Sequence, residues 1–537
     1  MQAESPTVNS KAFERRWLGL VFIGVSLIVI SLDNTILNVA IPSISRTLGA
    51  TASELQWIID AYVLIFAALL LTMGGLGDRF GRKRALQIGL VLFGIGSLAA
   101  ALSPTTGILI ASRAFLGIGG ATIMPATLSI ISATFPANER PRAIATWAAV
   151  FALGVGIGPV IGGWLLEHFE WNSVFLVNLP VITVALIGGA YALGESRDEH
   201  APKADIPGVV LSITGLFSLL YGIIEAGQKG WTDETVLLSF GVAIVLLGIF
   251  AWWENRNPDA MLPMRFFRNM SFTGANLALA FVTFSLFGAT FFLSQYLQTI
   301  QGYSTLEAGI GGLPLAITLT IVASRSSFVA ARLGNKYTVA LGIAIAGLGL
   351  LVMSETYHIG TPFIVIAIGQ IILATGMGTA FSPATNSIMA SVPISKAGIG
   401  SAMNDTTRQL GGALGVAVLG TVLNNLYMQG VNTLHTDLPQ LPAAAFDAIS
   451  SSIQAAHIVA NNPQVPTAAR DLIINTSNQA FVNGMGNAMF IGALVMFTAA
   501  LLALALLPAV ATRMEDEYEI EAEAAANVEV IPVASGD

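Results

Sequence analysis

The segment that decides the fold reads Gly74-Gly75-Leu76-Gly77-Asp78-Arg79-Phe80-Gly81-Arg82-Lys83-Arg84, and it separates two long apolar runs. Its glycines permit a tight turn and let two helices approach closely. Asp78 is placed to pair with a basic residue or with the positive end of another helix. We therefore expect two membrane helices joined by a short basic turn, with Asp78 reaching across an interface inside the protein.

The composition is that of a membrane protein. Hydrophobic residues make up 54% of the 537 residues and charged residues only 10%, against roughly 25% charged in soluble domains. The absence of cysteine excludes thiol and disulfide chemistry. The net charge of −8 arises from residues 515–537, which hold eight acidic side chains and no basic one. Such a run is typical of a solvated tail, and nothing in the chain resembles a nucleic-acid-binding surface.

Apolar runs long enough to cross a bilayer recur along the whole chain, at about 20 residues each. The fourteen runs fall near 17–40, 56–76, 85–103, 107–132, 143–166, 173–193, 207–226, 235–253, 272–298, 307–331, 337–354, 362–388, 398–427 and 482–507. An even number of spans places both ends of the chain on the same side of the membrane.

Lysine and arginine are distributed unevenly between the two sets of loops. Eighteen of the 24 lie in the chain ends and in one set of loops: Lys11, Arg15, Arg16, Arg79, Arg82, Lys83, Arg84, Arg140, Arg142, Arg197, Lys203, Arg256, Arg265, Arg268, Arg332, Lys336, Lys396 and Arg513. The other loops hold three, and three more lie within the spans. Because cytoplasmic loops carry this excess, we expect both termini in the cytoplasm and the chain in the plasma (inner) membrane.

The chain repeats itself weakly. Residues 117–129, which contain Pro125, are echoed by residues 376–387, which contain Pro383, about eight spans later. Two six-helix halves separated by an extra helix pair produce this offset, and such repeats are typical of secondary transporters, whose substrate site lies between the halves. Chance similarity among glycine- and alanine-rich helices is the alternative.

The expected fold is an all-α membrane protein with fourteen transmembrane helices. Its expected units are a cytoplasmic segment 1–16, a six-helix bundle 17–193, a linker with two extra helices 194–270, a second six-helix bundle 271–507 and an acidic cytoplasmic tail 508–537. Within the second bundle, residues 428–481 are expected to form an extracellular helical hairpin from 443–459 and 467–481. This hairpin either covers the outer opening or is an inert part of the surface.

Two motifs resemble those of one family, the major facilitator superfamily. The turn between the second and third runs is similar to the signature loop of that family. In the family this loop is a conformational latch on the cytoplasmic side. The matching residues are Gly74, Asp78, Arg79, Gly81 and Arg82. The fifth run is similar to the motif of proton-driven antiporters within the superfamily; its residues are Gly154, Gly158, Pro159, Gly162 and Gly163. Small residues four apart let helices touch, and the proline bends the helix.

Asp33 and Arg113 are the first candidate functional pair. The stretch around Asp33 is similar to the first helix of the fourteen-helix drug:proton antiporters, and Arg113 resembles the arginine that this family places near that aspartate and uses in proton coupling. A carboxylate at membrane depth marks an ion or substrate path by default, and a buried guanidinium needs an acceptor. The usual glutamine three residues after the arginine is Leu116 here. A snorkelling arginine or a static ion pair is the structural alternative.

Asp60 and Asp405 are the candidate substrate-binding acids. Trp57 and Tyr62 flank Asp60, and a carboxylate among aromatic rings can hold a lipophilic cation; the alternative is that the rings belong to the interfacial belt. Both acids resemble acidic positions in relatives that export quaternary ammonium compounds and cationic dyes. Arg408, three residues after Asp405, can instead neutralise it in a structural pair. Phe284 and Met403 are expected among the adaptable apolar groups that line the cavity.

The resemblance implies a proton-coupled multidrug efflux antiporter that confers antibiotic resistance by exporting lipophilic cationic drugs, antiseptics and dyes. We expect its partners to be these cations, protons and the lipid bilayer, and its acting unit to be a monomer. The sequence has no nucleotide-binding loop, no nucleophile elbow and no metal-ligand spacing of histidines, so we expect no enzyme activity, no cofactor and no metal. The alternatives are an exporter dedicated to one endogenous metabolite, lipid or antibiotic, and a membrane sensor that signals through its tail.

The acidic tail offers a test that distinguishes a transporter from a membrane sensor. Deletion of residues 515–537 should leave export unchanged, because none of the candidate coupling or substrate residues lies in the tail. Dye efflux from cells expressing the full-length and the truncated chain at equal levels measures this. A truncated chain that is inserted normally but does not export would contradict the expectation.

Overall fold

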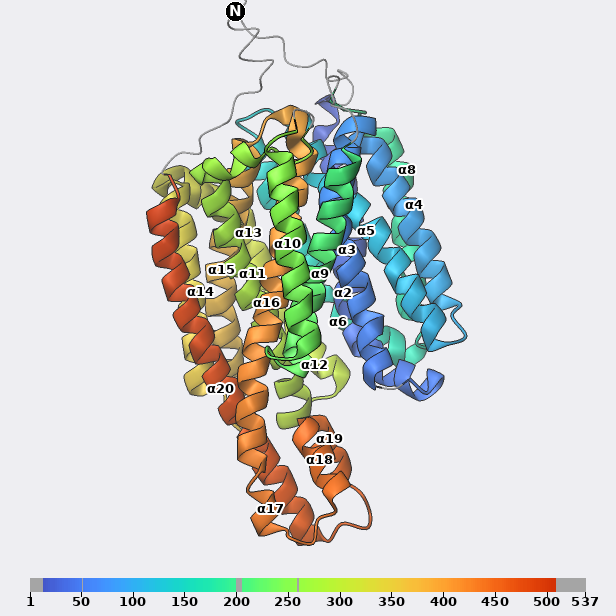
Figure 1. Cartoon of the computed structure of the whole chain (residues 1–537), viewed down its shortest axis with the longest axis vertical. Coiled ribbons are helices and arrows are strands. Elements are labelled where there is room, and N and C mark those ends of the chain that lie inside the picture. Colours follow the sequence, from blue (N-terminus) through green and yellow to red (C-terminus); the bar gives the residue numbers. More distant parts are fainter. Residues whose placement is uncertain (1–12, 51, 199–204, 258–259, 509–537) are drawn as a thin grey trace, which may run out of the picture.

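A bundle of long helices makes up the structure, a computed structural model that describes residues 13–50, 52–198, 205–257 and 260–508 (Figure 1). Residues 1–12 of the expected N-terminal segment and 509–537 of the expected acidic tail lie outside the described residues. Among the described residues, fourteen helices are long and apolar enough to cross a membrane. The predicted number of spans is therefore confirmed, and the protein is a multi-pass membrane protein.

The helices of the first half belong to the spans expected between 17 and 193. They are α2 (Arg16–Leu48), α3 (Ala52–Phe80), α4 (Arg82–Ala101), α5 (Thr106–Thr134), α6 (Arg140–His168), α7 (Ser173–Leu176) and α8 (Asn178–Ala192). Two further helices follow, α9 (Ile206–Lys229) and α10 (Glu234–Glu254). They lie in front of the two halves in Figure 1, where α9 packs against α3 and α16 while α10 packs against α9.

The second half contains the remaining spans and several short helices. They are η1 (Met264–Arg268), α11 (Met270–Gln295), η2 (Tyr296–Ile300), α12 (Thr305–Gly311), α13 (Leu313–Leu333), α14 (Asn335–Thr356), α15 (Phe363–Ser391), η3 (Ile394–Lys396), α16 (Ala397–Val431), α17 (Leu434–Asp437), α18 (Ala443–Ser451), α19 (Ile453–Ala460) and α20 (Thr467–Leu506).

Several helices begin at a residue whose side chain caps the first turn. In lipid the backbone must satisfy its hydrogen bonds within the helix, so only the first and last turns need other partners. Thr105, Asp205, Asp233 and Asn269 accept hydrogen bonds from the first turns of α5, α9, α10 and α11. Ser304 and Glu307 form a capping box at α12. Polar residues between apolar runs thus mark the starts of these five helices.

The two halves repeat the same helix pairings. In the first half α3 packs on α5, α4 on α5 and α2 on α6, and in the second half α13 packs on α15, α14 on α15 and α11 on α16. Pro125 lies inside α5 and Pro383 inside α15, so the weak sequence echo corresponds to equivalent helices. Across the interface, α3 packs on α16 and α6 on α13. The fold is therefore two six-helix bundles with an additional helix pair, as predicted.

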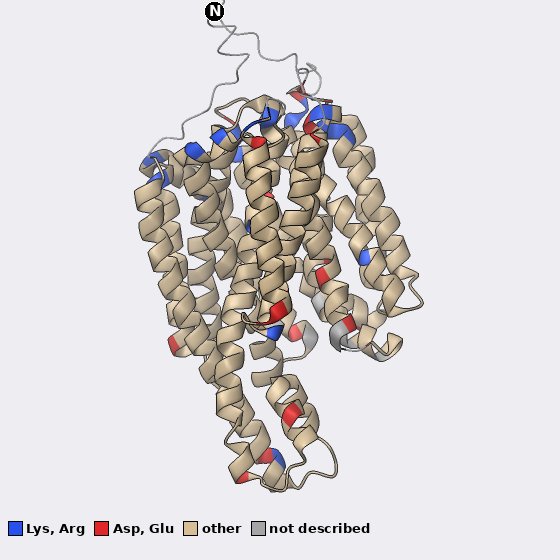
Figure 2. Cartoon of the chain, viewed as in Figure 1, with Lys and Arg blue, Asp and Glu red and all other residues tan. Residues whose placement is uncertain are grey.

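Charge distinguishes the two ends of the bundle. Lysine and arginine gather at the top of Figure 2, which we call the basic end; it carries the α3–α4 turn, the start of α6 and the end of α13. At the opposite end α16 and α20 extend past the other helices, and α17, α18 and α19 lie beside them (Figure 1). The 40 residues of α20 correspond to roughly 60 Å, twice the thickness of a bilayer core.

This extension differs from the expected hairpin in two details. The predicted helix 443–459 is broken at Ser452, which has an extended backbone and caps α19 through its side chain. The predicted helix 467–481 does not end before the last span but continues into it as α20, because no proline or polar turn interrupts it. The core of the extension includes Tyr427, whose hydroxyl donates to the Ile449 carbonyl at 2.9 Å.

Glycines on α6 hold α2 and α6 together. A methyl group at Gly154 or Gly158 would collide with the hydroxyl of Ser31 or Thr35 on α2, and one at Gly162 would meet Ile36 at 2.7 Å. The first bundle therefore depends on small residues along this seam, which we call the α2–α6 seam.

A Gly→Ala substitution in the seam should affect stability differently from one at an open position on α10. Gly158→Ala should lower the melting temperature, because overpacking a close contact costs about 1–3 kcal/mol. Gly241→Ala on α10 adds a methyl group with nothing within 4 Å and should leave the melting temperature unchanged or raise it slightly, because alanine is the better helix former. Tryptophan-fluorescence melting of the purified protein in detergent measures both, and equal melting temperatures would contradict the seam.

Candidate functional site

Asp33 and Arg113 form a buried ion pair inside the first bundle. Asp33 lies on α2 and Arg113 on α5, and each is 1% exposed. Arg113 Nη1 donates to Asp33 Oδ2 at 2.5 Å. The other carboxylate oxygen accepts a longer hydrogen bond, 3.4 Å, from Asn178 Nδ2 on α8, which also donates to Ser97 Oγ on α4 at 3.1 Å. The structure thus brings together the predicted pair, and it adds an amide that the sequence did not indicate.

Arg113 has two further partners, both on α3. Its Nε donates to the Ile58 carbonyl at 3.0 Å, and its guanidinium lies 4.5 Å from the centre of the Tyr62 ring. Tyr62 in turn stacks on Phe66. We grouped Tyr62 with Asp60 from their proximity in sequence, but residues two apart lie on different faces of a helix. The structure corrects that grouping, since Tyr62 contacts Arg113.

Asp60 lines a cavity of about 180 Å³ between α3 and α9. The cavity is lined by Gln56, Trp57, Asp60, Leu64, Tyr221, Ile224, Glu225 and Lys229. The Trp57 and Tyr221 rings lie 6.3 Å apart at 31°, and Lys229 pairs with Glu225 at 2.8 Å. Sequence reasoning found Trp57 but missed Tyr221 and Lys229, because only the fold brings α9 beside α3. The volume is below the roughly 300 Å³ of a drug-sized site, so it fits a charged head group or one ring.

Asp405 forms a separate cluster on α16. It is 1% exposed, and its Oδ1 accepts hydrogen bonds from Arg408 Nη1 at 3.2 Å and from Asn404 Nδ2 at 3.1 Å. The predicted i,i+3 pair with Arg408 is therefore present. Phe284 lies at the contact between α11 and Gly415 of α16, and Met403 packs at the edge of the core.

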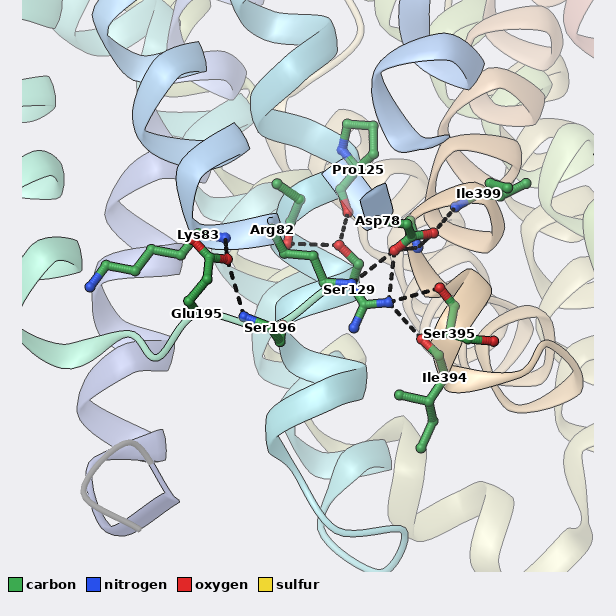
Figure 3. Close-up of polar contacts among 12 residues, drawn as sticks. Asp78, Arg82, Lys83, Pro125, Ser129, Glu195, Ser196, Ile394, Ser395 and Ile399 are labelled. Atoms are coloured by element: carbon green, nitrogen blue, oxygen red, sulfur yellow. Dashed lines mark hydrogen bonds and ion pairs between the residues drawn. The ribbon is translucent and has the colours of Figure 1, made fainter. Parts of the chain in front are cut away.

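The α3–α4 turn ties the two halves together at the basic end (Figure 3). The Asp78 carboxylate accepts from Gly398 N at 2.9 and 2.8 Å and from Ile399 N at 3.2 Å. An aspartate of the first half thereby caps α16 of the second, where its charge also meets the positive end of the helix. Arg82 Nε donates to Asp78 Oδ1 at 2.8 Å, and its Nη2 donates to the carbonyls of Ile394 and Ser395 at 2.6 and 3.2 Å. We call these contacts the basic-end latch.

The glycines of the turn make this approach possible. A methyl group at Gly74 would collide with the backbone of Gly398, and one at Gly398 would collide with Gly74. Gly81 has a φ of 117°, a conformation that other residues rarely adopt, and a side chain there would meet the Glu195 carboxylate at 2.7 Å. Arg79 lies over the Phe80 ring, 5.3 Å from its centre. The spacing of the motif thus follows from one tight turn and one close helix crossing.

The glycine motif of α6 has two contacting faces. Gly154, Gly158 and Gly162 form the α2–α6 seam. Gly163 faces Leu306 of α12, and Pro159 approaches Gly309 of the same helix. One helix therefore connects the segment of α2 beside Asp33 to the second half of the protein.

Two similar bundles, a polar latch between them and carboxylates buried within the spanning helices are typical of a membrane transporter. The sequence model of the Major Facilitator Superfamily matches residues 23–416. The chain belongs to this superfamily.

Its relatives include drug-resistance proteins. The multidrug efflux pump LfrA of Mycolicibacterium smegmatis is 34% identical over 90% of this chain and 95% of its own. The tetracenomycin C resistance and export protein of Streptomyces glaucescens is 30% identical over 91% of each chain. The methyl viologen resistance protein SmvA of Salmonella typhimurium is 34% identical over 87% of this chain and 93% of its own. The solved proton:xylose symporter XylE has a TM-score of 0.60 at 14% identity, covering 96% of this chain and all of its own, which shows the shared fold.

The latch predicts that Asp78→Asn opens the basic end. Ser401 lies one helical turn after Gly398 and is 0% exposed, and the chain has no cysteine of its own. In a Ser401→Cys background, Asp78→Asn should raise the rate of thiol labelling at least about tenfold in detergent, because hydrogen bonds to a charged group contribute about 1.5–3 kcal/mol. Arg84→Gln is the matched control, since Arg84 is an exposed residue of the same turn. Equal rates in the two variants would argue against the latch.

Proposed function

We propose that this protein is a proton-coupled antiporter that exports lipophilic cationic drugs, antiseptics and dyes across the plasma membrane. The observation that carries the proposal is the buried pair of Asp33 and Arg113, joined at 2.5 Å and inaccessible to solvent. The efflux and resistance relatives support drug export. The basic end is the cytoplasmic one by the positive-inside rule, so both termini lie in the cytoplasm, and the acting unit is one chain.

Asp33 is the proposed proton switch. A proton that binds Asp33 Oδ2 replaces the hydrogen bond from Arg113 and removes the negative charge that compensates the guanidinium. Leaving a buried charge uncompensated is strongly unfavourable, by about 3–5 kcal/mol. Arg113 must then move relative to Asp33, or α2 must move relative to α5. Proton binding is thereby converted into a shift between helices.

The α2–α6 seam carries this shift to the interface between the halves. Ser31 and Thr35 flank Asp33 on α2 and contact Gly154 and Gly158 of α6. Because the glycines leave no free space, a displacement of α2 pushes α6. The same helix contacts α12 of the second half beyond Pro159. In this mechanism the antiporter motif transmits the state of Asp33, and the basic-end latch forms or opens in response.

Asp60 and Asp405 are the proposed cation-binding residues. Asp60 shares its cavity with Trp57, Tyr221 and Glu225, so two carboxylates and two rings line one space, which suits a cationic head group. Asp405 offers a carboxylate from the second half of the chain. Tyr62 is instead a positioning residue for Arg113, while Phe284 and Met403 are proposed to contribute adaptable apolar surface.

The second candidate function is export of a single antibiotic or metabolite. The relative from Streptomyces glaucescens, whose name specifies one compound, favours it. A deletion strain tested against chemically unrelated cations separates the two functions: sensitivity to several of them supports the broad exporter, and sensitivity to one compound supports the dedicated exporter.

Transport in inverted vesicles tests the proton switch. With an imposed pH gradient, Asp33→Asn should abolish uptake of a fluorescent cation, because an amide cannot take up and release the coupled proton. Asp60→Asn should weaken uptake by raising the KM. The control is Asp447→Asn, an exposed acid on α18, which should transport like the unsubstituted protein. Undiminished gradient-driven uptake by Asp33→Asn would overturn the assignment.

A further inference from the structure

Arg408 lies in a cage of aromatic rings. Its guanidinium carbon is 4.2 Å from the centre of the Phe151 ring, 5.0 Å from that of Phe381 and 5.6 Å from that of Trp147. All three distances are within the range of cation–π attraction. The Trp147 ring stacks on both phenylalanines, and its Nε1 donates to Thr127 Oγ1 at 2.9 Å. The cage rings therefore contact one another, and Trp147 is held by a hydrogen bond that does not involve Arg408.

The cage lies between the two halves of the protein. Trp147 and Phe151 belong to α6 of the first half, whereas Phe381 belongs to α15 and Arg408 to α16 of the second. Arg408 is 3% exposed. In transporters built from two repeats the substrate site lies at this interface, so the cage is where a substrate is expected to bind.

The polar groups around Arg408 are only partly satisfied. Arg408 makes one hydrogen bond to Asp405, at 3.2 Å, and among the described residues its Nε and Asp405 Oδ2 have no hydrogen-bond partner. Arg113 contrasts with it, because that guanidinium binds Asp33 at 2.5 Å and the Ile58 carbonyl at 3.0 Å. A buried carboxylate oxygen without a partner is unfavourable. The Asp405 cluster is thus suited to accept a further cationic or hydrogen-bonding group.

We propose that Trp147, Phe151, Phe381 and Asp405 form a binding site for lipophilic organic cations, and that Arg408 occupies this site as an internal cation until the substrate displaces it. Three aromatic faces and one carboxylate are the groups that recognise a quaternary or delocalised cation. The guanidinium has the same features, since it is planar, delocalised and weakly hydrated. This inference rests on the proposed export of cations and adds the subsite and its built-in competitor.

Competition follows from charge and space. The substrate and Arg408 have the same charge and are attracted by the same rings and the same carboxylate, and like charges repel strongly at these distances in a buried site. Occupancy by one therefore excludes the other. Displacement also breaks the bridge that Arg408 makes between α16 and the rings of α6, so binding of a cation loosens the contact between the halves.

Calorimetric titration of the full-length protein in detergent with tetraphenylphosphonium tests the exchange. Arg408→Ala should raise the affinity about tenfold, because it removes the internal competitor, whereas Arg408→Lys should raise it less, because a cation remains. The affinity for neutral triphenylphosphine oxide should be the same in Arg408→Ala as in the unsubstituted protein. The matched control is Arg325→Ala, an exposed arginine on α13, which should bind like the unsubstituted protein.

Substitutions of the aromatic rings distinguish binding in the cage from a general effect of removing a positive charge. Adding Phe381→Leu to Arg408→Ala should abolish the increase in affinity for tetraphenylphosphonium. An increase that survives this change would show that the cage is not the binding site. In the protein with Arg408 intact, Phe151→Leu and Phe381→Leu should each weaken binding severalfold, and they test the cage if Arg408→Ala does not fold. Unchanged or lower affinity in folded Arg408→Ala would show that Arg408 is a structural clamp and overturn the proposal.

The same titrations distinguish a failure of this inference from a failure of the proposed function. If the unsubstituted protein binds and transports tetraphenylphosphonium but the cage variants bind it normally, only the exchange site is wrong. If neither the unsubstituted protein nor Arg408→Ala binds the cation, the cationic substrate class is wrong and the exchange site falls with it.

Discussion

The ion pair of Asp33 and Arg113 is the interaction on which the rest of the account depends. Both side chains are buried at membrane depth, where each charge alone would be strongly unfavourable. The pair therefore has to be formed and enclosed whenever Asp33 is ionised. Asn178 and the Ile58 carbonyl complete its environment, so α2, α3, α5 and α8 all contact the ion pair that contains the Asp33 carboxylate. A change in the charge of that carboxylate affects four helices at once.

Close packing explains how so local a change reaches the rest of the protein. The α2–α6 seam begins beside Asp33, and α6 also supplies Trp147 and Phe151 to the cage around Arg408. The proposed proton site and the proposed cation site are thus connected by one glycine-rich helix. Antiport needs such a connection, because proton and substrate must each bias the same equilibrium between two arrangements of the halves. In the proposed mechanism the basic-end latch closes one of those arrangements through the hydrogen bonds between Asp78 and the start of α16.

The sequence predicted most of the fold and the polar contacts within single motifs. Apolar runs predicted the spans because lipid requires self-contained helices. The motif around Asp78 predicted a contact with a basic residue or a helix end, and Asp78 contacts both Arg82 and the start of α16. Beyond the pair of Asp33 and Arg113, which the family resemblance implied, and the reach of Asp78 to a second helix, contacts between distant helices were not predictable. Tyr62 contacts Arg113 because residues two apart point to different faces of a helix. Tyr221 and the rings around Arg408 became visible only when α9, α6 and α15 were placed in space. Aromatic residues in apolar helices carry no signal that distinguishes a cage from ordinary core.

Proton release on substrate binding tests the central claim most directly. In weakly buffered detergent solution at a series of starting pH values, addition of tetraphenylphosphonium to the protein should release protons, detected with a pH-sensitive dye. We predict that Asp33→Asn binds the cation but releases no protons, while Asp447→Asn releases as many protons as the unsubstituted protein. Undiminished proton release from Asp33→Asn would contradict the claim that this carboxylate carries the coupled proton.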